Sequence, residues 1–142
     1  MTTTVSAAAA ILGRLQAVPQ LTVYDGEVPT TPLKDAPGKV RPYAVLYMGA
    51  GRVPRSDRLA YAAANRDLGI TFQVTCAAGT RAGASWAVDK TRTALTGQRL
   101  SDGANETRLK ETTESQALKR DPEIPSDIRW YAPLLYRFET TT

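Results

Sequence analysis

The sequence predicts an α+β fold, a mostly antiparallel sheet with helices packed on one face. Two segments repeat apolar residues at helical spacing, and five others have the composition or alternation of strands. Their order along the chain is helix, strand, strand, strand, helix, strand, strand, which favours this class. With 142 residues, 42% of them hydrophobic, the chain is long enough for one core, so we expect a single domain over 1–142.

The first helix is predicted over residues 4–18. Thr3 or Thr4 can cap it, its run of alanines favours helix, and Pro19 ends it. Its apolar residues are expected near one face: Val5, Ala8, Leu12 and Leu15. This stretch lacks a basic leader and Arg14 interrupts its apolar run, so it predicts neither a signal peptide nor a membrane span.

Three strands are predicted next. Residues 20–26 read as a short strand closed by an Asp-Gly turn, and the nearly continuous apolar run 43–48 suits a strand buried on both faces. Residues 70–77 alternate cleanly, with one face formed by Ile70, Phe72, Val74 and Cys76. Cys76 is therefore expected to be a small buried hydrophobic residue. Between these strands, residues 56–67 fit a short helix or a hairpin strand equally well.

The second helix is predicted over residues 80–97, capped by Thr80 and ended by Gly97. Its inner face is expected to hold Ala84, Val88, Thr91 and Leu95. Trp86 falls roughly opposite that face. It is either a partner contact, since Trp is enriched in interface hot spots, or a side chain covered by a neighbouring loop.

The last two elements are strands of different character. Residues 107–120 are polar and rich in Thr, which favours an exposed edge strand with a bend. Residues 128–140 form a long closing strand with one face made of Trp130, Ala132, Leu134, Tyr136 and Phe138. Pro133 falls on the other face and indicates an edge position or a bulge.

The composition excludes several kinds of catalytic site. The chain has no histidine and one cysteine, so His-based triads, Cys-His dyads, the usual zinc sites and an internal disulfide are ruled out. Gly49-Ala50-Gly51 follows a strand, as in nucleotide-binding loops, but Pro54 replaces the third glycine and no helix pattern begins there. We therefore predict no enzyme activity, no cofactor and no metal.

The charge is unevenly distributed. Residues 1–99 hold 12 Lys/Arg against 6 Asp/Glu, a balance of +6, whereas residues 100–142 hold 6 against 8, a balance of −2. Basic residues gather around the Gly-rich segment at Lys39, Arg41, Arg52, Arg55 and Arg58. This basic loop could contact a phosphate backbone, pair with an acidic neighbouring subunit, or be solvated surface.

The pattern resembles the tail terminator, or tail completion, proteins of long-tailed siphovirus-type bacteriophages. The similar features are the N-terminal helix, "VYDGEVP", "RPYAVLYMGAG", "LGITFQVTCAAGTRAGASWAVDKTRTALTG" and the closing "WYAPLLYRFETTT". They span nearly the whole chain and include no catalytic motif.

The resemblance implies a structural virion protein of the phage neck, assembled in the host cytoplasm. Such proteins form a ring, typically a hexamer, that caps the tail tube, ends its polymerisation and joins the tail to the head connector. The implied partners are further copies of the chain, the tail tube protein and a connector or head-closure protein, with DNA passing through the lumen without sequence specificity and no membrane contact.

Two sets of residues are predicted to make these contacts. The subunit or partner interface is assigned to Trp86, Arg108, Lys110, Thr112 and Glu114. The lumen or a partner is assigned to the basic loop. One alternative is another head–tail connector protein, of the head-closure or adaptor kind. The other is a small basic nucleic-acid-binding protein, which the basic loop and the sequence pI of about 9.4 support.

Overall fold

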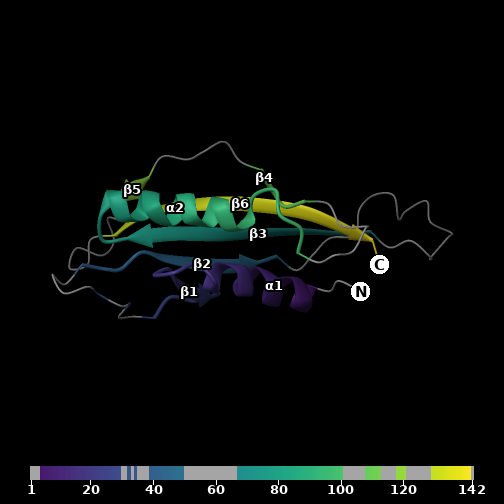
Figure 1. Cartoon of the computed structure of the whole chain (residues 1–142), viewed down its shortest axis with the longest axis horizontal. Coiled ribbons are helices and arrows are strands. Elements are labelled where there is room, and N and C mark those ends of the chain that lie inside the picture. The colour runs from purple at the N-terminus through teal and green to yellow at the C-terminus, as the bar shows by residue number, and fades with distance from the viewer. Residues whose placement is uncertain are drawn as a thin grey trace.

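The computed structural model describes most of the chain (Figure 1). The described residues are 4–29, 32, 34, 39–49, 67–100, 108–112, 118–120 and 129–141. The elements are α1 (Thr4–Gln16), β1 (Thr22–Asp25), β2 (Tyr43–Met48), β3 (Asp67–Ala78), α2 (Arg81–Leu95), β4 (Lys110–Glu111), β5 (Lys119–Arg120) and β6 (Trp130–Thr141).

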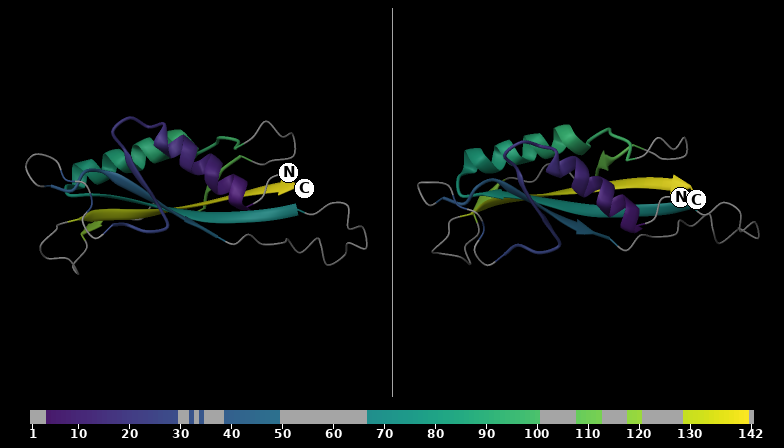
Figure 2. Two further views of the ribbon diagram at one scale, coloured as in Figure 1. Left: turned by 90° about the horizontal axis from the view of Figure 1, so that it is seen from below. Right: turned by 60° about the horizontal axis from the view of Figure 1, so that its bottom comes forward.

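The strands form one six-stranded sheet in the order β1-β2-β3-β6-β4, with β5 also pairing with β6. All pairs are antiparallel except β1 with β2, which run parallel. Both helices lie on the same face of the sheet (Figure 2). The predicted class, an α+β fold with a mostly antiparallel sheet and helices on one face, is therefore confirmed.

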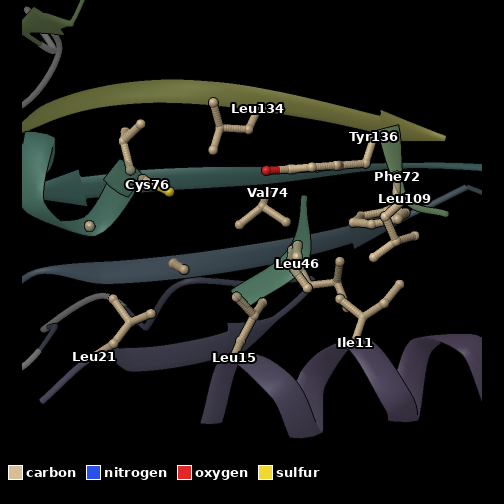
Figure 3. Packing of buried hydrophobic residues seen from close by; sticks show 14 of the residues in the cluster. Ile11, Leu15, Leu21, Leu46, Phe72, Val74, Cys76, Leu109, Leu134 and Tyr136 are labelled. Atoms are coloured by element: carbon tan, nitrogen blue, oxygen red, sulfur yellow. The ribbon is translucent and has the colours of Figure 1, made fainter. Parts of the chain in front are cut away.

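The main core lies between the two helices and the sheet (Figure 3). From α1 it takes Ala7, Ile11 and Leu15, all at most 1% exposed, whereas Val5 is 80% exposed. The predicted inner face of the first helix was thus right at Leu15, which is buried, and at Leu12, which packs against the core, but wrong at Val5. Alanines and leucines occupy so many positions of this helix that several helical stripes are apolar, and packing against α2 and β2 selects one of them.

The two central strands match their predictions. In β2, Ala44 and Leu46 face the main core, while Tyr43 and Val45 belong to a second cluster on the opposite face with Val40 and Ala77. In β3 the alternating residues from Ile70 to Cys76 are buried on the helix side. This strand is longer than expected, because its first residues pair with the end of β6 from Asp67 onward. Apart from Asp67, the ambiguous segment 56–67 lies outside the described residues.

Helix α2 is also as predicted. The Thr80 hydroxyl accepts a hydrogen bond of 3.0 Å from the Gly83 amide, which caps the helix. The residues buried beneath it include all four of the predicted inner face: Ala84, Val88, Thr91 and Leu95. After the helix ends, Gly97 has φ 76°, a left-handed conformation that glycine adopts without strain.

The predicted edge strand over 107–120 is present as two short strands. β4 pairs Lys110 with Arg137, and β5 pairs Lys119 with Tyr131, so the two are out of register by three residues and do not form one continuous ladder. Both lie along one side of β6, and the other side of β6 pairs with β3. The long strand is therefore not at the sheet edge, but Pro133 falls between its pairings with β4 and β5, where a proline interrupts no described ladder on that side.

Candidate functional site

The beginning of α2 meets the segment that leads into β2. The Gly79 amide donates to the Val40 carbonyl at 2.9 Å, which holds residues 39–42 against the turn before the helix. This contact is tertiary, since the two residues lie far apart in the sequence. It brings Arg41 and Pro42 next to the first turns of α2.

Trp86 stands at this junction. Its side chain is half-buried and packs against the main core, and it lines a hollow of about 400 Å³ together with Gln20, Arg41 and Pro42. Neighbouring segments therefore cover part of the Trp86 ring, as one of the two interpretations expected, and a hollow remains beside it. The other interpretation, a partner contact, stays a prediction. Gln20 has φ 66°, a left-handed conformation that is strained for a residue with a side chain.

Segments with basic residues meet at the same end of the molecule, where β3 ends and α2, β2 and β6 begin (Figure 1). Arg41 is exposed and lines the hollow, and Arg81 is exposed in the first turn of α2. Lys119 and Arg120 are exposed on β5, which pairs with the first residues of β6. We call these four residues the basic rim. Lys39 is exposed at the same end.

The predicted basic loop is divided by β2. Lys39 and Arg41 precede this strand, whereas the chain leaves its far end at Gly49, about 20 Å away for six residues in extended conformation. Arg52, Arg55 and Arg58 follow Gly49 and lie outside the described residues. The described part of the chain therefore does not place the five basic residues on one surface.

Gly49 has a packing role. Its amide donates to the Thr71 carbonyl at 2.9 Å, and a Cβ at this position would lie 2.5 Å from the same oxygen. The residue is a glycine because β3 passes this close. Its amide is engaged in the sheet, so it is not available to a phosphate, which agrees with the sequence argument against a nucleotide-binding loop.

The predicted interface strand holds residues with different environments. Arg108 donates from Nη1 to the Gly97 carbonyl at 2.8 Å, so it supports the turn after α2. Lys110 is exposed and lies directly opposite Arg137 of β6, on the sheet face away from the helices. Thr112 continues the pairing, since its amide donates to the Leu135 carbonyl at 2.8 Å. Glu114 lies outside the described residues.

The sheet face away from the helices carries tyrosines. Tyr24 and Tyr43 meet edge to face, with ring centroids 5.5 Å apart, and Arg129 donates from Nη1 to the Tyr43 hydroxyl at 3.4 Å. Burial raises the pKa of Tyr43 above its ordinary value, against the opposing effect of Arg129. Tyr47 is 40% exposed beside a hollow of about 230 Å³ that it shares with Tyr43 and Tyr131.

A polar network lies on the helix side. Arg92 donates from Nε and Nη2 to the two carboxylate oxygens of Glu111, at 3.1 and 3.0 Å. Cys76 Sγ and Thr91 Oγ1 are 3.3 Å apart, and the Thr96 and Tyr136 hydroxyls are 3.0 Å apart. Burial raises the pKa of the Cys76 thiol to about 11 and that of Tyr136 to about 12.

These groups stabilise the fold and do not form a reactive pair. The thiol and the phenol are protonated near neutral pH, which suits buried structural groups better than nucleophiles. Among the described residues, no group of three or more Cys, Asp or Glu side chains is arranged to hold a metal ion. This end and this face of the molecule present aromatic, apolar and cationic side chains, which are suited to binding.

Several residues of these surfaces were missed by the sequence argument. Gln20, Pro42, Arg81, Lys119, Arg120 and Arg137 belong to segments that only tertiary packing brings together. The sequence does show basic residues near the ends of the predicted strands and helices. It does not show the order of the strands in the sheet, which decides which of these residues lie near one another.

Within the part of the chain that is described, no helix is long and apolar enough to cross a membrane. Comparison with family models and with curated proteins found no family model and no curated protein that matches the chain.

Proposed function

We propose that this chain is a structural subunit of the neck of a long-tailed bacteriophage, of the tail terminator kind. It would form a ring that caps the tail tube, stops its growth and offers a surface to the head connector. The resemblance implies that this ring is a hexamer. The proposal starts from the resemblance of nearly the whole sequence to such proteins and from the binding character of its surfaces.

One structural observation carries most weight, namely that the sheet has two different edges. β1 is one edge, and no described strand pairs with its outer side. The other edge consists of the two-residue strands β4 and β5, which pair with β6 at only four register positions. Two non-equivalent surfaces on opposite sides of a subunit are what a closed ring of identical subunits requires.

The β4 edge also has an unfavourable feature that a partner would relieve. Lys110 and Arg137 lie opposite each other, and like charges in this position destabilise a sheet. Neighbouring Arg108 and Thr112 are exposed as well. An acidic surface on the next subunit would convert this repulsion into attraction, so we assign the β4 edge to the subunit interface.

The experiment is assembly of the purified chain, measured by native mass spectrometry and negative-stain electron microscopy, alone and with the tail tube protein of the same phage. The expected result is a closed ring of defined copy number and tubes that stop growing when the chain is added. Lys110→Glu should weaken the ring, whereas Lys90→Glu, on the exposed side of α2, should leave it intact.

A chain that stays monomeric at high concentration and in the presence of tubes would contradict the proposal. A ring that forms but binds only connector protein, with tube growth unchanged, would instead support a head-closure or adaptor role. The position of the chain in an electron-microscopy map of the particle separates these two outcomes directly.

A further inference from the structure

The hollow beside Trp86 joins an apolar wall to a cationic one. Trp86 and Pro42 supply the apolar surface, and Arg41 lines the same hollow with its charged group exposed to solvent. At about 400 Å³ it falls within the size range of binding pockets, which can take up a bulky side chain. Trp and Arg are the residues most enriched among interface hot spots.

The surroundings of the hollow are positively charged. Five described segments that meet at this end include no Asp or Glu: 17–22, 39–43, 77–81, 118–120 and 129–131. The exposed Asp89 follows on α2, three residues after Trp86. The four cations of the basic rim come from three of these segments. The amino-terminal end of α2, a helix of 15 residues, adds its partial positive charge.

We propose that this end of the molecule binds an acidic protein segment that places an apolar side chain in the Trp86 hollow and its carboxylates on the basic rim. Charge complementarity selects an acidic partner, because anions are attracted here and cations repelled. The hollow favours an acidic segment that also carries an apolar side chain over an acidic segment without one.

The same observations favour a protein over a nucleic acid. Sequence-tolerant binding of single strands uses aromatic rings with an open face on which bases stack. The Trp86 ring is half-buried and packed against the core, so it offers a wall of a hollow rather than an open platform. This inference goes beyond the proposed function, since its apolar anchor site is the Trp86 hollow at the beginning of α2, whereas the ring contact is assigned to Lys110 on β4.

The binding test uses fluorescence anisotropy with labelled probes and the full chain. The principal probe is a short peptide of alternating Glu and Leu. Its comparators are the same peptide with Gln for Glu, the same peptide with Ser for Leu, and a short DNA duplex. We expect the Glu–Leu peptide to bind at least about tenfold more tightly than each comparator.

Variants locate the site. Arg41→Glu combined with Arg81→Glu changes two exposed residues and should weaken peptide binding by at least about tenfold without loss of thermal stability. The matched control is Lys90→Glu combined with Arg99→Glu, also two exposed cations, which should bind like the wild type. Trp86→Ala should also abolish peptide binding. If Trp86→Ala disturbs folding, the double variant of Arg41 and Arg81 still tests the site.

Three results would overturn the inference. One is equal loss of binding in both double variants, which would indicate non-specific charge attraction. Another is tighter binding of the DNA duplex, abolished by the same rim substitutions. The third concerns a triple variant, Asp121→Asn with Glu123→Gln and Asp127→Asn. If this variant binds the peptide and the wild-type chain does not, the chain's own acidic residues compete for the rim.

Oligomeric state, measured on the same samples by size-exclusion chromatography, keeps this inference separate from the proposed function. Peptide binding by a chain that forms no ring contradicts only the ring. A ring that binds no peptide, in the wild type or in the variants, contradicts only the acidic-segment site.

Discussion

Two buried side chains with ionisable groups, Cys76 and Tyr136, link different elements of the fold in their uncharged forms. Cys76 is 0% exposed and its thiol lies 3.3 Å from the Thr91 hydroxyl, which links β3 to α2. Tyr136 stacks on Phe72, with ring centroids 5.4 Å apart, and its hydroxyl contacts Thr96. Burial keeps both acidic groups protonated, and this makes the stability of the fold sensitive to alkaline pH.

The pKa of Cys76 is raised from an ordinary value of about 9 to about 11 by burial. The unfolded chain therefore loses this proton first, so the stabilisation is present below pH 9 and is lost as the pH rises toward 11. We expect the thermal midpoint to be nearly constant from neutral pH to about pH 9 and to fall above it. The fall should be shallower in Cys76→Ala, measured by circular dichroism.

A thiol-reactive dye checks the same argument at neutral pH. The folded chain should react no faster than it unfolds, and chain denatured in guanidinium should react at once. Rapid stoichiometric labelling of the folded protein at neutral pH would show that the thiol is accessible and would contradict its assigned burial.

The short strand β4 is held by contacts from α2 and from the turn after it. Leu109 is 1% exposed in the core, and its amide and carbonyl bond to Gln98 and Gly97 at 2.9 Å each. Arg92 donates hydrogen bonds to both carboxylate oxygens of Glu111. This hydrogen bond raises the pKa of Arg92 above its ordinary value, so the guanidinium stays charged.

The Arg92–Glu111 pair is expected to contribute about 0.5–1 kcal/mol, because bidentate geometry favours it while Arg92 is 36% exposed and screened by solvent. A double-mutant cycle with Arg92→Met and Glu111→Gln, measured by urea unfolding, should give this coupling at low salt and less at high salt. Zero coupling at low salt would mean that the ion pair does not help to hold β4, which the contacts of Leu109 and the pairing with β6 then hold.

At the scale of the whole molecule, the two sheet faces have different roles. One is covered by both helices (Figure 2) and contains the main core. The other carries Tyr47, Lys110 and Arg137. Lys110 and Arg137 lie opposite each other on this second face, and like charges in this position are expected to lower the stability of the isolated chain. Surfaces used for binding commonly have this cost, because their charges are chosen for the partner.

Lys110→Glu should therefore raise the stability of the isolated chain while weakening its assembly. The new carboxylate would lie opposite Arg137, and cross-strand pairs of opposite charge contribute roughly 0.2–1 kcal/mol. Urea unfolding of the monomer should register the gain. The control is Lys119→Glu, which lies opposite Tyr131 on the same edge and should give little change. A loss of stability in Lys110→Glu would show that Lys110 has a favourable contact in the monomer.

The sequence by itself determined the class of fold and its best-patterned elements. The alternation from Ile70 to Cys76 and the helical spacing from Ala84 to Leu95 predicted β3 and α2 with their inner faces, since each pattern fits one period only. The Ala-rich α1 permitted several apolar stripes, so its inner face followed from packing. The absence of histidine argues against His-based catalysis by residue type alone, and Pro54 in the glycine loop argues in the same way against nucleotide binding.

Only the tertiary structure decided the strand order and the surfaces that depend on it. Parallel pairing of β1 with β2 and the three-residue offset between β4 and β5 arise from contacts between distant segments, which local periodicity does not encode. Trp86 and Arg41, predicted for separate surfaces, line one hollow because the Gly79–Val40 hydrogen bond joins their segments. A binding surface is composed of side chains from several elements, so its composition is readable from the sequence while its assembly is a property of the fold.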